Sequence, residues 1–228
     1  MKDTAIIVAG GQGKRMNSDI PKQFMSIQGI PILIYTLRVF YRFDPNLDII
    51  VVLPENEIST WKALCDIHAF NLPHRIVKGG KTRFHSVKNA VDNLVYKGLV
   101  AIHDGVRPFV SLETIGRCFK TARNKGNAIP VIKPVDSIRI ITKDGNYHLE
   151  RDNARIIQTP QVFKAQILTD AYTQPYNETF TDDASVVESS GHKINLVEGN
   201  IENFKITTPV DLMTAEVYVQ KLIQTEQS

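Results

Sequence analysis

Short apolar runs alternate along the first half of the chain with longer segments whose apolar residues recur every three or four positions. Short runs bounded by turn residues predict buried strands, and the longer periodicity predicts amphipathic helices. Strands are expected at 4–9, 48–53, 75–77, 99–103 and 128–132, and helices at 32–43, 57–70, 83–96 and 112–124. Because strands that alternate with helices form a mostly parallel sheet covered by helices, the pattern predicts the α/β class.

The alternation then breaks. Two β-rich runs, 135–141 and 147–151, flank the pair Asp144-Gly145, which is a hairpin turn signal. We therefore expect a β-arm at about 134–156, inserted into the α/β frame. The apolar positions of so long an arm cannot all reach the main core, which predicts that the arm packs on another subunit.

Helical periodicity resumes after the arm. The last helix has a strong start signal, with Thr208 as N-cap, Pro209 at the first helical position and Asp211 three residues after the cap. Ser111 is likewise the expected N-cap of the helix that follows it. After the arm, helices are expected at 164–172, 182–189 and 209 to about 222, and strands at 193–197 and 203–206.

The composition is that of a globular protein. Of 228 residues, 43% are hydrophobic and 22% are charged, and 27 Lys and Arg against 24 Asp and Glu give a net charge of +3. This balance excludes general disorder and argues against a nucleic-acid partner. Cys65 and Cys118 fit neither a zinc spacing nor a disulfide framework. Without an apolar run of membrane-spanning length or a signal-peptide stretch, we expect a cytoplasmic protein with no membrane partner.

A glycine loop, Ala9-Gly10-Gly11-Gln12-Gly13-Lys14-Arg15-Met16, directly follows the first strand. Glycines let backbone N–H groups approach a phosphate, although a tight strand-to-helix turn is the alternative. The loop is not a P-loop, because Lys14 is not followed by Ser or Thr, and it is not a dinucleotide fingerprint, because Met16 replaces the third glycine. Lys14, Arg15 and Lys22 add positive charge that suits a triphosphate.

The pattern A-G-G-x-G-x-R-M followed by P-K-Q is similar to the signature of sugar-phosphate nucleotidylyltransferases, and Pro21-Lys22-Gln23-Phe24 resembles their cytidylyltransferase branch. The resemblance runs along essentially the whole chain. It implies one Rossmann-like nucleotidyltransferase domain over residues 1–228, with the β-arm as a dimerisation element. The implied catalytic residues in this region are Arg15 and Lys22, and the implied nucleotide contacts are Ala9, Gly10, Gly11 and Gly13.

A second motif extends the resemblance into the middle of the chain. The segment from Gly79 to Val87 resembles G-G-x-x-R-x-x-S-V. In the family this segment holds the cytosine and ribose, which implies nucleotide contacts for Gly80, Lys81 and Ser86. The family often has an acid where Lys81 stands. A plain hydroxyl on the helix surface is the alternative interpretation of Ser86.

A third motif, from His103 to Pro108, resembles H-D-x-x-R-P. An Asp at the carboxyl end of a parallel strand lies where ligands bind in open α/β sheets, and a carboxylate beside phosphates commonly serves Mg²⁺. Asp104 is therefore the expected nucleotide contact and Mg²⁺ ligand, and Arg107 is an expected substrate contact. The alternative is an Asp104–Arg107 pair that only fixes the loop.

The C-terminal half resembles the part of the family that binds the sugar phosphate. The family's arm exchanges between the subunits of a homodimer, and its arginine reaches the sugar phosphate in the partner's site. Arg151 aligns best with that arginine, and Arg155 is the competitor. The resemblance implies Arg151, together with Lys205 in N-x-K-[IV]-T, as catalytic residues that place the attacking sugar phosphate. Thr159 in T-P-Q and Thr181 in T-D-[DE]-A-S are implied as substrate contacts.

The resemblance implies transfer of a cytidylyl group from CTP to a sugar or polyol phosphate, with Mg²⁺ as cofactor and pyrophosphate as product. The segment from Thr181 to Glu188 resembles the branch that uses 2-C-methyl-D-erythritol 4-phosphate in non-mevalonate isoprenoid biosynthesis. Val106 and Phe109 resemble the ribitol 5-phosphate branch, which is the alternative. A non-catalytic nucleotide-binding regulator is a further alternative, although such a module need not keep residues for both halves of the chemistry.

Overall fold

The computed structural model describes residues 2–11, 16 and 20–226. At its centre is an eight-stranded sheet in the order β10-β7-β11-β6-β1-β4-β5, with β12 paired to β7. Strands β6, β1, β4 and β5 run parallel to one another. Each strand expected before the arm is present. The strands of the sheet are β1 (Thr4–Val8), β4 (Asp48–Leu53), β5 (Arg75–Lys78), β6 (Leu99–Asp104), β7 (Asn127–Ile132), β10 (Ile156–Ile157), β11 (Gln161–Lys164) and β12 (Leu196–Glu198).

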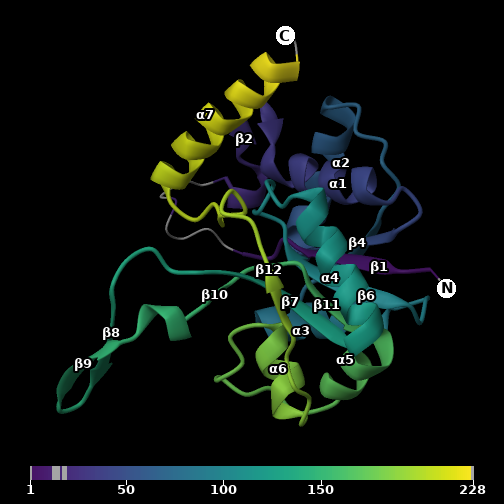
Figure 1. Ribbon diagram of the computed structural model, residues 1–228. Helices are drawn as coiled ribbons and strands as arrows, with labels where there is room; N and C mark the ends of the chain where they lie inside the picture. The colour runs from purple at the N-terminus through teal and green to yellow at the C-terminus, as the bar shows by residue number, and fades with distance from the viewer. Residues whose placement is uncertain (1, 12–15, 17–19, 227–228) are drawn as a thin grey trace.

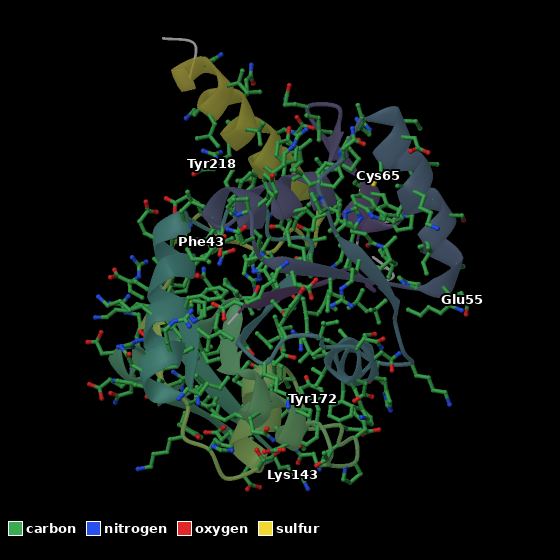
Figure 2. All side chains as sticks on the ribbon, turned by 90° about the vertical axis from the view of Figure 1, so that its right-hand side faces the viewer. Phe43, Glu55, Cys65, Lys143, Tyr172 and Tyr218 are labelled. Carbon is green, nitrogen blue, oxygen red and sulfur yellow. The ribbon has the colours of Figure 1, made fainter. Side chains whose placement is uncertain are left out.

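Helices cover both faces of the sheet (Figure 1). Because successive strand residues point to opposite faces, Ala5 and Ile7 of β1 pack against one group of helices and Ile6 packs against the other. Figure 2 shows Cys65 and Tyr172 on these two opposite sides. The α/β class is therefore confirmed. The first group is α1 (Ile32–Phe43), α2 (Ile58–Ile67) and α4 (Leu112–Lys125), and the second is α3 (Arg83–Asp92), α5 (Ala165–Ala171) and α6 (Asp183–Ser189).

Two helices end earlier than the periodicity predicts. Helix α2 stops before Ala69, whose φ of +46° takes the backbone out of the helical region. Helix α3 stops at Asp92, because Asn93 caps it and donates a side-chain hydrogen bond to the carbonyl of Asn89. Ser111 caps α4 as expected, since its side chain accepts a hydrogen bond from the N–H of Thr114.

One strand prediction in the second half is wrong, and another is confirmed only in part. The segment 203–206 is not a strand, because its polar backbone groups bond to side chains and loops: the Asn203 carbonyl accepts from Arg107, and the Ile206 N–H donates to the Val106 carbonyl. The strand expected at 193–197 is β12, which covers only Leu196–Glu198. Conversely, β11 was not predicted, although it lies antiparallel between β6 and β7.

The hairpin expected in the arm is present as β8 (Ile138–Thr142) and β9 (Gly145–Leu149), which form a sheet of their own. It projects away from the helices and the main sheet (Figure 1). A short helical turn, η4 (Arg151–Asn153), leads back towards β10. Ile141 and Tyr147 are exposed in the single chain.

Helix α7 (Pro209–Glu226) packs on a small third cluster that includes Val106, Ile206 and Ala215. Its start follows the expected signal, because the Asp211 carboxylate accepts the backbone N–H of Thr208 at 2.8 Å. None of the helices in the described ranges is long and apolar enough to cross a membrane. The remaining short elements are η2 (Lys22–Phe24), β2 (Ser26–Ile27), β3 (Ile30–Pro31) and η3 (Glu55–Glu57).

Candidate active site

A cavity of about 710 Å³ opens at the carboxyl ends of the parallel strands. This edge is where ligands bind in open α/β sheets. The loops after β1, β4 and β5 and the end of β6 all contribute to its wall. The structure thus brings together most of the nucleotide-side residues expected from the sequence. Those that line the cavity are Ala9, Gly10, Gly11, Lys22, Gly80, Lys81, Ser86 and Asp104, together with Lys205 from the acceptor side.

The glycine loop allows Lys22 to lie close to the backbone. A Cβ atom on Gly11 would come within 3.2 Å of Lys22 Cε and 3.6 Å of its Nζ. Glycine at this position therefore makes room for the lysine side chain along the cavity wall. Gly13 and Arg15, which the resemblance implies as a nucleotide contact and a catalytic residue, lie outside the described residues.

The second glycine loop is shaped by Ser86. The Ser86 hydroxyl accepts the N–H of Gly80 at 3.0 Å and donates to the Thr82 carbonyl at 2.9 Å. Its side chain is buried, not displayed on the helix surface. A Cβ on Gly80 would lie 2.4 Å from His85 Cβ, so glycine is required for the loop to turn into α3 this closely. Lys81 is exposed at the cavity wall.

Asp104 ends β6 and is surrounded by positive charge. Its Oδ2 atom lies 3.0 Å from Arg107 Nε and 3.1 Å from Lys205 Nζ. Burial alone would raise the pKa of the Asp104 carboxyl. Lys205, Arg83 and Arg107 reverse this effect and hold its pKa well below the usual range. The carboxylate is therefore ionised at neutral pH, and the Asp104–Arg107 pair of the alternative interpretation is present.

A buried polar group lies behind Asp104. Thr159 Oγ1 accepts the N–H of Asp104 at 3.2 Å and lies 3.0 Å from His103 Nδ1, while His103 Nε2 lies 3.0 Å from the Arg107 carbonyl. Burial lowers the pKa of His103 to about 4, so its ring is neutral at physiological pH. Thr159, expected to contact substrate, thus holds the end of β6.

A second cluster of buried polar side chains positions Lys205. The sequence motifs assigned no role to its members Asn203 and Gln158. Arg107 Nη1 donates to the Asn203 carbonyl at 2.7 Å, and the Asn203 side-chain amide donates to the Thr159 carbonyl at 2.7 Å. Gln158 Nε2 donates to the Asn200 carbonyl at 2.9 Å. Lys205 follows Asn203 by two residues, so these bonds fix the segment that brings its ammonium group to Asp104. Asn203 opens the N-x-K-[IV]-T motif and Gln158 directly precedes T-P-Q, so their places in these motifs were the sequence signal that could have identified them.

Four expected acceptor-side residues do not line the cavity of their own chain. Arg151 is on the arm, where its Nη1 donates to the Val135 carbonyl at 2.7 Å. Its competitor Arg155 bonds to the carbonyls of Asp152 and Ala154. Thr181 is exposed just before α6. Among the described residues that line the cavity, Arg107, Arg151, Thr159 and Thr181 are not found.

The sheet is mostly parallel, two glycine loops lie at its carboxyl edge, and Lys205 and Arg107 contact one buried carboxylate. This combination is that of the nucleotidyltransferase class. The chain belongs to the IspD family, described as 2-C-methyl-D-erythritol 4-phosphate cytidylyltransferase, whose model matches residues 4–221. The cytidylyltransferase resemblance is thereby confirmed.

Similar proteins with the same name cover nearly all of the chain. The relative from Phocaeicola vulgatus is 51% identical over 219 residues, which are 96% of this chain and 100% of the relative. The relative from Bacteroides fragilis is 52% identical over 212 residues, or 93% and 97% of the two chains. Among solved structures, 2-C-methyl-D-erythritol 4-phosphate cytidylyltransferase from Thermus thermophilus matches with a TM-score of 0.79 at 29% identity, covering 96% of this chain and 100% of that chain.

Proposed function

We propose that this enzyme transfers the cytidylyl group of CTP to 2-C-methyl-D-erythritol 4-phosphate and releases pyrophosphate. The observation that carries the proposal is the cavity in which the glycine loops, Lys22, Asp104 and Lys205 converge. Family membership supports the methylerythritol acceptor over ribitol 5-phosphate and over a non-catalytic regulator.

The chemistry needs positioning and charge stabilisation more than proton transfer. A phosphate monoester is already a nucleophile, so its oxygen attacks the α-phosphorus of CTP in line with the departing pyrophosphate. Lys22 and Arg15 would stabilise the charge that develops on the phosphates. Lys205 would hold the attacking phosphate. Gly80, Lys81 and Ser86 would hold the nucleoside through the loop that precedes and begins α3.

The residues present fit a magnesium ion bound mainly by the substrate. Mg²⁺ usually keeps several waters and takes only one or two carboxylates beside phosphate oxygens. The described part of the chain contains no cluster of three His, Cys, Asp or Glu side chains that could hold a metal without substrate. Asp104 is ionised, and both its basic neighbours contact Oδ2. Its Oδ1 would therefore be the metal ligand, and the ion would neutralise phosphate charge.

A homodimer built through the arm would complete the acceptor side. The arm exposes apolar residues such as Ile141 and Tyr147, which a single chain leaves without a core. Arg151 stands on this arm and not in the cavity of its own chain. We infer that Arg151 enters the partner's cavity and binds the sugar phosphate there.

Mixing two inactive variants tests the dimer. Arg151→Ala chains and Lys22→Ala chains are each expected to be nearly inactive alone. In a heterodimer, one site receives native Lys22 from its own chain and native Arg151 from the partner, whereas the other site lacks both. Pyrophosphate release should therefore recover towards about half of the wild-type rate per heterodimer, since one site in two is correctly assembled. A mixture that stays inactive although heterodimers are shown to form would contradict the shared site. The same mixing experiment with Arg155→Ala in place of Arg151→Ala is the control for the competing arginine.

The activity itself is tested by pyrophosphate release from CTP and Mg²⁺. We expect turnover with 2-C-methyl-D-erythritol 4-phosphate, much slower turnover with ribitol 5-phosphate, and none after chelation of the metal. Preferential use of ribitol 5-phosphate would establish the alternative acceptor. CTP binding by calorimetry without turnover of either acceptor would instead establish a nucleotide-binding regulator.

A further inference from the structure

Helices α3 and α6 are joined at their first residues by an ion pair. Arg83 begins α3 and Asp183 begins α6. Arg83 Nη1 donates to Asp183 Oδ1 at 2.8 Å, and Nη2 donates to Oδ2 at 2.6 Å. This bidentate geometry adds directional specificity to the attraction between the two charges. It fixes two segments that lie 100 positions apart in the sequence.

The carboxylate of this pair is enclosed. The Asp183 side chain is 0% exposed, whereas the Arg83 side chain is 30% exposed and lines the active-site cavity. Tyr172, which Figure 2 labels on the α5 and α6 side of the sheet, donates its hydroxyl to Asp183 Oδ1 at 2.7 Å. Burial would lower the pKa of Arg83, but Asp183 more than offsets it and raises the pKa, so the guanidinium stays charged.

Stacked aromatic rings also connect the start of α3 to the segment that leads into α6. The Phe84 ring is stacked with Tyr172 at 4.9 Å between centroids and with Phe180 at 5.7 Å. Phe180 immediately precedes Thr181, the residue expected at the sugar phosphate. The loop that carries Thr181 is thus anchored to the start of α3.

The loop is held from its other side as well. Asp182 forms a capping box with Ser185, and its Oδ2 accepts a hydrogen bond from Gln161 Nε2 at 2.8 Å. Gln161 Oε1 in turn accepts the Ala184 N–H at 2.8 Å. Together with the Phe84 stack, the Arg83–Asp183 pair therefore connects the loop to the nucleotide side of the cavity.

We propose that the Arg83–Asp183 pair is a positioning device that sets the sugar-phosphate loop at Thr181 against the nucleotide loop at 80–82. This role rests on the proposed function. A buried ion pair is weak evidence for stability, because well-packed apolar residues often replace such pairs without loss. A pair with an enclosed carboxylate that joins the nucleotide loop to the expected sugar-phosphate loop is better explained by the geometry it imposes. Arg83 lines the cavity and also contributes to the positive charge that lowers the pKa of Asp104.

The chain offers a matched control pair outside the cavity. Arg75 contacts Asp48 through Nε at 3.1 Å and through Nη2, which is again a bidentate geometry. This pair joins β5 to β4, and neither residue lines the cavity. Asp48→Asn should therefore lower the melting temperature without changing how the enzyme treats either substrate.

The test compares Asp183→Asn and Arg83→Lys with wild type and with Asp48→Asn. Calorimetry measures the Kd for CTP, and pyrophosphate release measures kcat and the KM for the sugar phosphate. We expect the Kd for CTP to stay within about threefold, and kcat/KM for the sugar phosphate to fall by about tenfold or more, a size typical of coupling between sites. In wild type, a CTP analogue that cannot react should tighten binding of the sugar phosphate, and this tightening should be lost in both variants.

Nonadditivity provides a second readout. Because both changes break the same contact, Arg83→Gln combined with Asp183→Asn should cost no more than Arg83→Gln alone. Equal losses for CTP and the sugar phosphate, or a lower melting temperature with unchanged kinetics as in Asp48→Asn, would overturn the positioning role. If Asp183→Asn does not fold, Arg83→Lys decides the question. An inactive wild-type enzyme would overturn the proposed function itself, whereas an active wild type with unaffected variants would overturn only the role of the pair.

Discussion

Lys22→Ala should lower kcat by about 10²- to 10³-fold while changing the Kd for CTP far less, because a preorganised charge that acts mainly on the transition state is worth this much. Lys22 begins η2 and lies along the cavity wall close to Gly11. The ammonium group would meet charge that grows on the phosphates as pyrophosphate leaves. Single-turnover measurement of pyrophosphate release, with CTP affinity from calorimetry, separates the two effects.

Lys120→Ala is the matched control, since Lys120 is exposed on α4 and does not line the cavity. It should leave kcat and CTP affinity unchanged. Arg15→Ala should behave like Lys22→Ala if the resemblance has assigned its role correctly. Normal pyrophosphate release in Lys22→Ala would remove this residue from the catalytic assignment.

Asp104→Asn should lower kcat by about 10²-fold or more and abolish the normal dependence on Mg²⁺. Metal stabilisation of transferring phosphoryl groups amounts to several kcal/mol, and each 1.36 kcal/mol is tenfold in rate. The amide has no charge to hold the ion or to pair with Lys205 and Arg107. A titration of activity against Mg²⁺, beside a thermal melt, measures both consequences.

The thermal melt separates the two interpretations of Asp104. If the carboxylate only braces Arg107, Asp104→Asn should melt at a lower temperature while its remaining activity keeps the wild-type metal titration. Arg107→Lys is a useful comparison, because it keeps a positive charge but loses the contacts of Arg107 to Asp104 and to the Asn203 carbonyl. Arg107→Lys should weaken the Arg107–Asp104 contact while it leaves the Asp104 carboxylate in place. A normal metal titration in Asp104→Asn would therefore contradict the magnesium assignment.

The nucleotide side of the site could be predicted from the sequence because its signals are local. The residues Ala9, Gly80 and Asp104 follow or end strands, and the carboxyl ends of parallel strands meet at one edge of a sheet. Once the strands are predicted to be parallel, the residues at their carboxyl ends are expected to lie together. The helix starts at Leu112 and Pro209 were likewise encoded by neighbouring cap residues.

Features that depend on distant partners could not be predicted in this way. Arg83 and Asp183 were visible only as parts of two separate motifs, and nothing local shows that they form a pair. The four-residue strand β11 lacks a hairpin to either of its antiparallel neighbours, so its pattern alone did not identify it. The apolar residues near 203–206 suggested a strand, whereas buried side chains such as Gln158 occupy the backbone groups there.

The arm has a consequence for how such enzymes can diverge. Its two ends are hydrogen-bonded neighbours in the sheet, because Ile156 of β10 lies opposite Ile132 of β7 in an antiparallel pair. Insertions, deletions or charge changes between these positions would leave the order and register of the other strands untouched. The arm is therefore a part of the chain that selection can remodel independently of the main sheet. In the proposed homodimer, such remodelling would change subunit recognition and the group presented to the neighbouring acceptor.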